Sequence, residues 1–317
     1  MKSQYVEGLE SGQTVKEVFV LSRKSIKDKK GGGAYAVLEF TDRSGSIEGI
    51  AWDNTVEDIN VLSAGDFVFV VGNVNEYNDR LQIVVNSIKR VPENETEPED
   101  FLPQADEDIN HAFEEIENFR KQVKDTHLKQ LLDAFFGDKE LIEKFKRAPA
   151  AKRVHHAYLG GLVVHTRNVL RLADKIKTVY EALNRDLLIT AGILHDIGKV
   201  YEYIYARRLD FSTPGRMLGH IVIGYELVAE RIKQIPDFPE SLRLRLLHMI
   251  LSHHGEYEWG SPKQPKFLEA LVLHFIDNLD SKVEIMMSER KKNKGMEKEW
   301  SDYHPYLERE IYLREED

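Results

Sequence analysis

The chain has 317 residues, of which 42% are apolar and 31% charged, a composition that is ordinary for a globular protein and excludes wholesale disorder. It contains no cysteine. This excludes disulfide frameworks, thiolate zinc sites, iron–sulfur clusters and cysteine nucleophiles, and it fits a reducing cytoplasm. No window approaches about 18 consecutive apolar residues, and the N-terminus lacks the apolar stretch of a signal peptide. We therefore expect a cytoplasmic protein with no membrane partner.

The net charge of −10 is concentrated in one segment and does not decide the kind of partner. Residues 92–110 carry eight acidic residues, three prolines and no basic residue, and they show no apolar periodicity. Such a composition predicts a linker. We therefore expect a first domain over residues 1–91 and a second over residues 111–317.

Residues 1–91 contain short alternating runs of apolar and β-branched residues, which are typical of antiparallel strands. One helical stretch, residues 55–62, falls between the third and fourth runs. Five strands with a helix after the third is the order of an OB-fold barrel, and another small barrel of the SH3-like type is the alternative. The predicted strands cover residues 14–23, 34–42, 45–53, 66–74 and 81–91.

The predicted barrel carries aromatic and basic side chains suited to a single-stranded nucleic acid. Aromatic rings on barrel strands and hairpin ends stack on unpaired bases, and lysines beside a glycine run can follow a phosphate backbone. The alternatives are burial of the rings in the barrel core and a solvated loop for the lysines. The candidate contact residues are Tyr35, Trp52, Tyr77, Arg23, Lys24, Lys27, Lys29 and Lys30.

Residues 111–317 show helical periodicity, which predicts an all-α domain of seven or eight helices. Ten of the 12 histidines lie from residue 155 onward, several of them inside otherwise apolar helix faces. An aspartate buried on the same faces needs a partner, because an isolated buried charge is costly. A divalent ion explains this convergence. Imidazole and carboxylate without thiolate suit manganese, iron, cobalt, nickel or zinc better than magnesium or calcium, and we favour manganese.

A histidine, a His-Asp pair 30 residues later and a distant aspartate resemble the pattern of the HD-domain metal-dependent phosphohydrolases. The resemblance covers about residues 150–290 and includes the motif HDIGK at residues 195–199. The pairs Gly219-His220 and His253-His254 match those HD proteins that hold two metals about 3.5–4 Å apart. The resemblance implies that the first ion is held by His165, His195, Asp196 and Asp277. It implies that the second ion is held by Asp196, His220, His253 and His254.

Lys199 follows Asp196 by three residues, which places both on one helix face. Its ammonium group is suited to neutralise a phosphoryl oxygen as charge develops, and the alternative is a lysine that merely extends from a helix end. The HDxGK pattern of the family favours the catalytic role.

Asp280 lies one turn beyond Asp277, so spacing alone does not decide which of the two is the metal ligand. The resemblance selects Asp277 as the ligand and gives Asp280 a supporting role behind it.

The whole chain resembles the YhaM family of bacterial 3′-to-5′ exoribonucleases, in which an OB-fold precedes an HD domain. The matching features are HHAYLGGL before the first ligand, HDIGK, GH, SHHG, the DNLDSK run and WSDYHPYLEREIY near the C-terminus. In such a family His156 would contact the substrate phosphate, although His155 and His156 are equally suited to cap a helix. The paired histidines are followed by GEYEWGSP, without the signature of the HD-GYP class, which argues against cyclic dinucleotide hydrolysis.

These observations predict a metal-dependent 3′-5′ exoribonuclease of single-stranded RNA, with single-stranded DNA as a second candidate substrate. The expected catalytic residues are Asp196, Lys199 and His156. One alternative is an HD nucleotide phosphohydrolase with a regulatory OB domain, which the OB domain disfavours because small substrates do not require it. The other is a non-catalytic single-strand-binding protein, which the complete ligand set disfavours. Polarity and RNA preference rest on the resemblance alone, and a homo-oligomer is compatible with the sequence.

Overall fold

The computed structural model describes residues 2–29, 32–78, 80–105, 107–152, 156–205, 209–293 and 298–314, the side chains of residues 53 and 54 excepted. Lys30 and His155, which the sequence analysis singled out, lie outside this described part. The chain divides into two compact units, Met1–Gln104 with Ile204–Leu209 and Ala105–Tyr203 with Asp210–Asp317. The first unit thus extends to Gln104, whereas the sequence predicts a domain end at residue 91.

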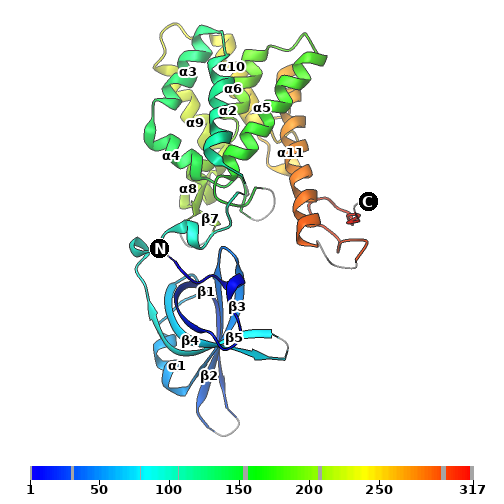
Figure 1. The fold of residues 1–317 in the computed structure, drawn as a ribbon. Helices are drawn as coiled ribbons and strands as arrows, with labels where there is room; N and C mark the ends of the chain where they lie inside the picture. Colours follow the sequence, from blue (N-terminus) through cyan, green and yellow to red (C-terminus); the bar gives the residue numbers. More distant parts are fainter. Residues whose placement is uncertain are drawn as a thin grey trace. The chain divides into compact units, whose positions relative to one another are not determined.

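The first unit is a closed five-stranded barrel with the strand order β1-β2-β3-β5-β4 (Figure 1). Its strands are β1 (Thr14–Asp28), β2 (Ala34–Asp42), β3 (Gly45–Trp52), β4 (Phe67–Tyr77) and β5 (Arg80–Arg90). All neighbouring strands are antiparallel except β3 and β5. Helix α1 (Asp53–Asn60) follows β3. This arrangement confirms the predicted OB-fold order and excludes the SH3-like alternative.

Strand β1 closes the barrel because it pairs with both β2 and β4. Residues 14–20 pair with β4 and residues 20–28 pair with β2, so one long strand connects both ends of the sheet. Val15, Phe19 and Leu21 point into the core, where the rings of Phe19 and Phe40 lie 5.9 Å apart. Closure leaves the barrel without a free sheet edge.

The first part of the acidic segment packs against the barrel. It forms the short turns η2 (Glu93–Glu95) and η3 (Pro98–Asp100), and the ring of Phe101 lies 4.7 Å from that of Phe67. The buried carboxylate of Asp100 accepts hydrogen bonds from the backbone N–H of Lys2 at 3.2 Å and from the hydroxyl of Tyr5 at 2.5 Å. The acidic composition indicated a linker, but these anchors attach its first half to the barrel.

The second unit is helical, which confirms the predicted fold class. In its described part, eight helices have nine or more residues and two are shorter. The helices are α2 (Ile109–Lys121), α3 (Thr126–Phe136), α4 (Lys139–Arg147), α5 (Gly161–Val179), α6 (Arg185–Leu194), α7 (Lys199–Glu202), α8 (Thr213–Met217), α9 (Gly219–Lys233), α10 (Glu240–Ser252) and α11 (Leu268–Lys292). Between α7 and α8 in the chain a short β6 (Tyr203–Tyr205), which the division between the units crosses, pairs with β7 (Leu209–Phe211). The short helix η4 (Tyr257–Trp259) follows α10.

Local sequence determines several helix starts. The side chains of Asp108, Asp125, Asp138 and Asn184 accept backbone N–H groups at the first turns of α2, α3, α4 and α6. Helix α5 packs against α2, α6 and α11, and α10 contacts α6, α9 and α11 (Figure 1). These contacts bring the histidine-bearing faces of α5, α9, α10 and α11 together. No helix in the described part is long and apolar enough to cross a bilayer.

Candidate metal centre and barrel surface

The seven predicted metal ligands converge at the centre of the helical unit. They come from separate elements, so the cluster exists only in the folded chain. The members are His165 in α5, His195 and Asp196 directly after α6, His220 at the start of α9, His253 and His254 directly after α10, and Asp277 in α11.

The first half of the cluster surrounds Nε2 of His165. This atom lies 3.2 Å from Nε2 of His195 and 3.2 Å from Oδ1 of Asp277. Oδ2 of Asp196 is 3.5 Å from His165 Nε2 and 3.4 Å from His195 Nε2. Atoms bound about 2.1 Å from one ion lie about 3.0–3.4 Å apart in octahedral or tetrahedral geometry. The spacing therefore fits one divalent ion with little rearrangement.

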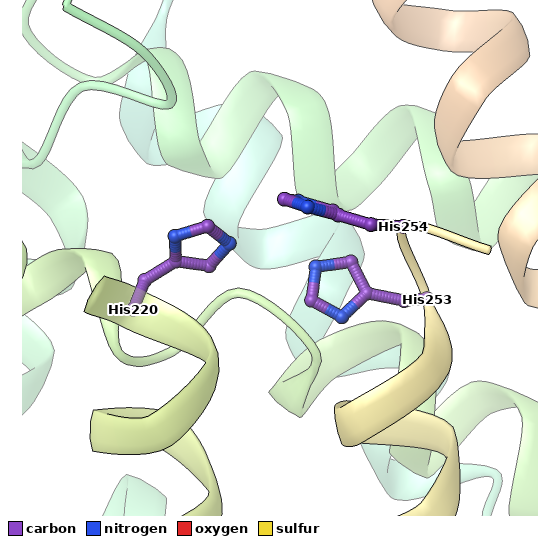
Figure 2. A group of neighbouring side chains, drawn as sticks. All are labelled: His220, His253 and His254. Carbon is purple, nitrogen blue, oxygen red and sulfur yellow. The ribbon is translucent and has the colours of Figure 1, made fainter. Parts of the chain in front are cut away.

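The second half faces the other oxygen of the same carboxylate. Oδ1 of Asp196 lies 3.4 Å from Nε2 of His220 and 3.5 Å from Nε2 of His253. Figure 2 shows the rings of His220, His253 and His254 pointing into a common space, and one ligand atom from each lies within 4.8 Å of the others. Asp196 thus directs one oxygen to each half, which is the arrangement of a bridging carboxylate.

Unsatisfied polar atoms test whether this donor set fits a metal. Within the described residues, Oδ1 of Asp196 and Nε2 of His220 and His253 are buried and make no hydrogen bond. Leaving a buried polar atom without a partner costs about 1–3 kcal/mol, and these three atoms face the same point. Neutral imidazoles and carboxylates are ligands for divalent transition metals. The cluster therefore fits a divalent metal site.

Hydrogen bonds from outside the cluster fix the orientation of all five imidazoles. In each ring Nδ1 donates outward and leaves Nε2 directed at the cluster, as in most protein metal sites. The acceptors are Asp280 for His165 (2.7 Å), the Gly192 carbonyl for His195 (2.9 Å), Glu202 for His220 (3.0 Å), the Ile250 carbonyl for His253 (2.8 Å) and the Trp259 carbonyl for His254 (3.0 Å).

Asp277 and Asp280 occupy different places although they lie one turn apart on α11. Asp277 faces the Nε2 atoms of His165 and His195, at 3.2 and 4.0 Å. Asp280 lies behind His165 and accepts hydrogen bonds from its Nδ1, from Nε2 of His156 at 3.0 Å and from the amide of Asn168 at 2.8 Å. A carboxylate with three such donors is suited to hold His165 in place.

The cluster has a distinct protonation pattern. Burial disfavours a charged His165, but hydrogen bonds to Asp277 and Asp280 outweigh it and raise the pKa of His165 to about 10. Burial and the neighbouring imidazoles lower the pKa of His254 to about 3. Burial opposes ionisation of Asp196, yet Lys199 and His195 hold the pKa of that carboxyl well below its usual range. The His165 half therefore holds a proton, whereas His254 is neutral and ready to bind a metal.

Two glycines permit the close approaches around the cluster. A Cβ on Gly198 would lie 2.0 Å from the backbone oxygen of His220, so the HDIGK turn contacts the start of α9 directly. Gly255 has a φ of +78°, and a Cβ there would lie 2.2 Å from the ring of His274. Larger residues at these positions would move His195 or His253 away from the cluster.

The barrel displays the predicted contact residues on the outer face of β1, β2 and β3. Lys27, Tyr35 and Trp52 are adjacent across these strands, and the rings of Tyr35 and Trp52 lie 5.7 Å apart. Nζ of Lys29 is 4.9 Å from the centre of the Trp52 ring, which is 50% exposed. Core burial, the alternative for the aromatic residues, does not hold for Trp52.

A groove of about 850 Å³ continues along the barrel surface. Arg23, Tyr77 and Arg80 line it, together with the carboxylates Glu39 and Glu48. Tyr77 is 64% exposed, so it is also outside the core. Lys24 differs from its neighbours, because its Nζ donates to the Ile59 and Asn60 carbonyls at the end of α1.

Comparison with known proteins agrees with both units. Residues 162–282 match the model of the HD domain, and residues 18–91 match that of the OB-fold nucleic acid binding domain. The chain is 35% identical to the 3′-5′ exoribonuclease YhaM of Bacillus velezensis over 279 residues, which are 88% of each chain. It is 35% identical to the enzyme of that name from Bacillus subtilis, over 87% of this chain and 88% of the relative.

The chain belongs to the YhaM 3′-5′ exoribonuclease family. This confirms the predicted family and the pairing of an OB-fold with an HD domain. The HD model ends at residue 282, so the C-terminal residues 298–314 are an addition to the matched HD core.

Lys199, predicted to be catalytic, forms a buried ion pair with Asp196, with Nζ 2.5 Å from Oδ2. It also lines a cleft that reaches His253, His254 and Asp277. The side chain is therefore held beside the cluster and does not extend freely from a helix end.

His156, for which the sequence predicts a substrate contact, lies beside Asp280 in this structure. It is buried, its Nε2 donates to Asp280, and its Nδ1 lies 2.7 Å from the hydroxyl of Tyr158. Its backbone has a φ of +48°, which is unusual for a residue with a side chain. The geometry connects His156 to the cluster through Asp280 and His165.

Three residues next to the cluster were not predicted. Glu202 accepts both the backbone N–H and Nδ1 of His220, Asn168 donates to Asp280, and His274 donates to the His253 carbonyl at 2.8 Å. Asn168 follows His165 by three residues, so helical spacing could have indicated it. The sequence carries no comparable signal for Glu202, because it ends the short helix α7 and its partner His220 lies 18 residues later in the chain.

Proposed function

We propose that this protein is a metal-dependent 3′-5′ exoribonuclease that hydrolyses phosphodiester bonds of single-stranded RNA at a dimetal site. The observation that carries the proposal is the carboxylate of Asp196, with one oxygen directed at the His165 half and the other at the His220 half. Membership of the YhaM family supports the reaction and its polarity. The second substrate, single-stranded DNA, stays a prediction.

The proposed ligands divide into two sets that share Asp196. His165, His195 and Asp277 would hold one ion, and His220, His253 and His254 the other. Two divalent cations held in this way supply Lewis acidity and lower the pKa of water, which is the chemistry that phosphodiester hydrolysis requires. Manganese is the ion that we favour, and cobalt, iron, nickel and zinc suit the same donors.

The protein's own groups orient the ligands and stabilise negative charge. The outward Nδ1 hydrogen bonds keep each imidazole in the tautomer that presents Nε2. Lys199 places an ammonium group at the cleft, where it would stabilise a non-bridging phosphoryl oxygen. The predicted contact of His156 with phosphate stays a prediction, because Asp280 and Tyr158 engage its ring nitrogens in this structure.

The barrel would hold the RNA strand through its bases and its phosphates. Trp52 and Tyr35 offer stacking surfaces, and Lys27, Lys29 and Arg23 supply positive charge on the same face. Glu39 and Glu48 lie in the groove that Arg23 lines, so the positive charge is confined to part of the face. These contacts favour single strands, whose bases are exposed for stacking.

The test is hydrolysis of a 5′-end-labelled single-stranded RNA with Mn²⁺, with product lengths resolved on a gel. We expect a ladder that shortens one nucleotide at a time from the 3′ end. Asp196→Asn should abolish the ladder, and Asp133→Asn, an exposed acid on α3 paired with Arg120, should leave it unchanged. Uncut RNA together with hydrolysis of free nucleotides would favour the nucleotide phosphohydrolase. RNA binding without any hydrolysis would favour the non-catalytic protein.

Two further expectations stay predictions, namely the cytoplasmic location and the homo-oligomer. Helix α11 carries a stripe of exposed apolar side chains at spacings of three or four residues, which a second copy of the chain would cover. The stripe consists of Leu268, Leu271, Phe275, Leu279, Val283 and Met287. Size-exclusion chromatography with light scattering should show a multimer that Phe275→Lys dissociates. A monomeric native protein would show that the predicted homo-oligomer is wrong.

A further inference from the structure

A cleft of about 750 Å³ leads from the cluster to the C-terminal residues of the chain. It is lined by four residues in or beside the cluster, namely Lys199, His253, His254 and Asp277. It is also lined by Trp259 from η4, by Lys282 on α11, and by residues 306–309 near the C-terminus. Sites of about 300–1,000 Å³ typically hold a small organic molecule. The cleft therefore has room for a nucleotide next to the proposed metal ligands.

The C-terminal wall of this cleft is a folded hairpin. Backbone bridges join Trp300 to Tyr312 and His304 to Arg309, with the His304 N–H donating to the Arg309 carbonyl at 2.9 Å. Leu307 and Ile311 are buried against Ile285 of α11 and anchor the hairpin. The side chains on its cleft side are therefore held at fixed positions relative to α11. None of these hairpin residues belongs to the segment that matches the HD domain.

Two aromatic rings in the cleft remain accessible. Trp259 is 50% exposed and Tyr306 is 64% exposed. The carbonyl of Trp259 accepts the hydrogen bond from Nδ1 of His254, so one backbone group ties this aromatic residue to a proposed metal ligand. Exposed rings fixed beside a phosphodiester-cleaving centre are suited to stack on a nucleobase.

Positive charge accompanies these rings. Nζ of Lys282 lies 5.5 Å from the centre of the Trp259 ring. Nε of Arg309 donates to the Leu307 carbonyl at 2.8 Å, which holds the arginine at the hairpin turn. One carboxylate of the hairpin, Glu308, also lines the cleft. Lys282 and Arg309 outnumber Glu308, so these residues favour an anionic ligand.

We propose that Trp259 and the hairpin of residues 300–312 form the subsite for the terminal nucleotide of the RNA. The base stacks on Trp259 and Tyr306, and Lys282 and Arg309 face its phosphate groups. This inference rests on the proposed function, because the subsite is useful only beside a centre that cleaves the adjoining phosphodiester. The released product, a nucleoside 5′-monophosphate, is the smallest ligand that it should bind.

The test measures how strongly adenosine 5′-monophosphate and inorganic phosphate each inhibit the Mn²⁺-loaded enzyme. The substrate is methyl p-nitrophenyl phosphate, a phosphodiester without a nucleobase. Tyr306→Ala and Trp259→Leu should each raise the inhibition constant of the nucleotide about tenfold, and that of phosphate should not change. Tyr303→Ala is the matched control, because Tyr303 is 62% exposed on the same hairpin and is not among the described residues that line the cleft.

Isothermal titration of adenosine 5′-monophosphate into the same Mn²⁺-loaded proteins repeats the comparison without turnover. If the wild type hydrolyses neither the ester nor RNA, the proposed function fails, and the titration still decides whether the nucleotide subsite exists. The subsite is refuted if the nucleotide binds no better than phosphate. It is also refuted if both aromatic variants bind the nucleotide as tightly as the Tyr303→Ala protein does.

Discussion

The barrel surface and the helical centre present their functional groups in opposite ways. On the barrel, Trp52 and Tyr77 are largely exposed and each can contact a ligand independently. In the helical unit, His165, His195 and Asp196 are buried, and each is connected to another member of the cluster. Free-energy changes from substitutions at independent contacts add up, whereas one substitution in a connected network disturbs the other members as well. Substitutions should therefore have graded effects on the barrel and severe effects in the cluster.

The largest effect is expected for Asp196→Ala. Asp196 faces both histidine sets and the ammonium of Lys199, so its loss should disrupt both proposed ion sites. We expect the kcat for RNA hydrolysis with Mn²⁺ to fall at least about 1,000-fold, the upper range for removal of one preorganised electrostatic group. Steady-state kinetics measures this loss.

A thermal melt of the same variant separates chemistry from folding. Asp196→Ala leaves the buried ammonium of Lys199 without its partner, so the melting temperature of the metal-free protein should fall, and kcat is compared at a temperature well below the melt of the variant. Turnover within about tenfold of wild type would show that the two halves work without a shared ligand.

A smaller effect is expected for Asp280→Asn. Asp280 orients His165 from behind, and loss of such a supporting group typically lowers metal affinity or activity about 10–100-fold. Asp277→Asn should cost more, because Asp277 faces the Nε2 atoms of the cluster. Mn²⁺ titrations of both variants compare their metal affinities. A larger loss of affinity in Asp280→Asn would show that Asp280 is the ligand and Asp277 the supporting group.

The sequence predicts the helical centre better than the barrel surface, and the reason is physical. Burial makes a polar side chain conspicuous among apolar neighbours, so His165 and the pair His195-Asp196 stand out in their helices. Glu202 at the end of α7 contacts His220, which lies 18 residues later in the chain, and Trp259 in η4 contacts His254. The periodicity of one helix encodes neither contact. On the barrel, Lys24 and Lys27 belong to one charged run, yet only the structure shows that Lys24 binds the end of α1.

The position of Phe101 is another feature that the sequence alone does not predict. Its segment is acidic and rich in proline, and composition alone predicts a linker. The packing of Phe101 on Phe67 depends on a position 34 residues away in the sequence, so no local pattern reveals it.

On the barrel we expect a moderate effect that depends on substrate length. Trp52→Ala should raise the KM for a long single-stranded RNA about tenfold, because one stacking contact contributes about 1–3 kcal/mol. The KM for a dinucleotide should not change, because a dinucleotide bound at the metal centre leaves no further base to stack on Trp52. Val61→Ala, at a side chain that is 78% exposed beyond α1, is the control. Equal changes for short and long substrates would exclude a strand-holding barrel.

A change of one pH unit should have an effect no larger than that of Trp52→Ala, because it alters only the protons released when metal binds. The pKa of His165 is raised to about 10, so this residue holds a proton at pH 7 that a metal must displace. His254, with its pKa lowered to about 3, has none to release. The Mn²⁺ affinity should therefore rise by up to about tenfold per pH unit between pH 6 and 9, and then level off above the pKa of His165.

Calorimetry in two buffers of different ionisation enthalpy counts these protons. We expect about one proton from His165 at pH 7. Fewer should be released in Asp280→Asn, because that variant lacks one of the two carboxylates that raise the pKa of His165. Proton release that is unaffected by Asp280→Asn would assign it to a different group.

The number of ions that one chain binds tests most directly whether Asp196 is shared by two metal ions. Equilibrium dialysis against Mn²⁺ followed by elemental analysis should give two ions per chain in the native protein, because Asp196 directs one oxygen to each half of the cluster. The Asp196→Ala protein should bind at most one ion, with lower affinity. One ion per chain in the native protein, or two in Asp196→Ala at unchanged affinity, would contradict the shared carboxylate.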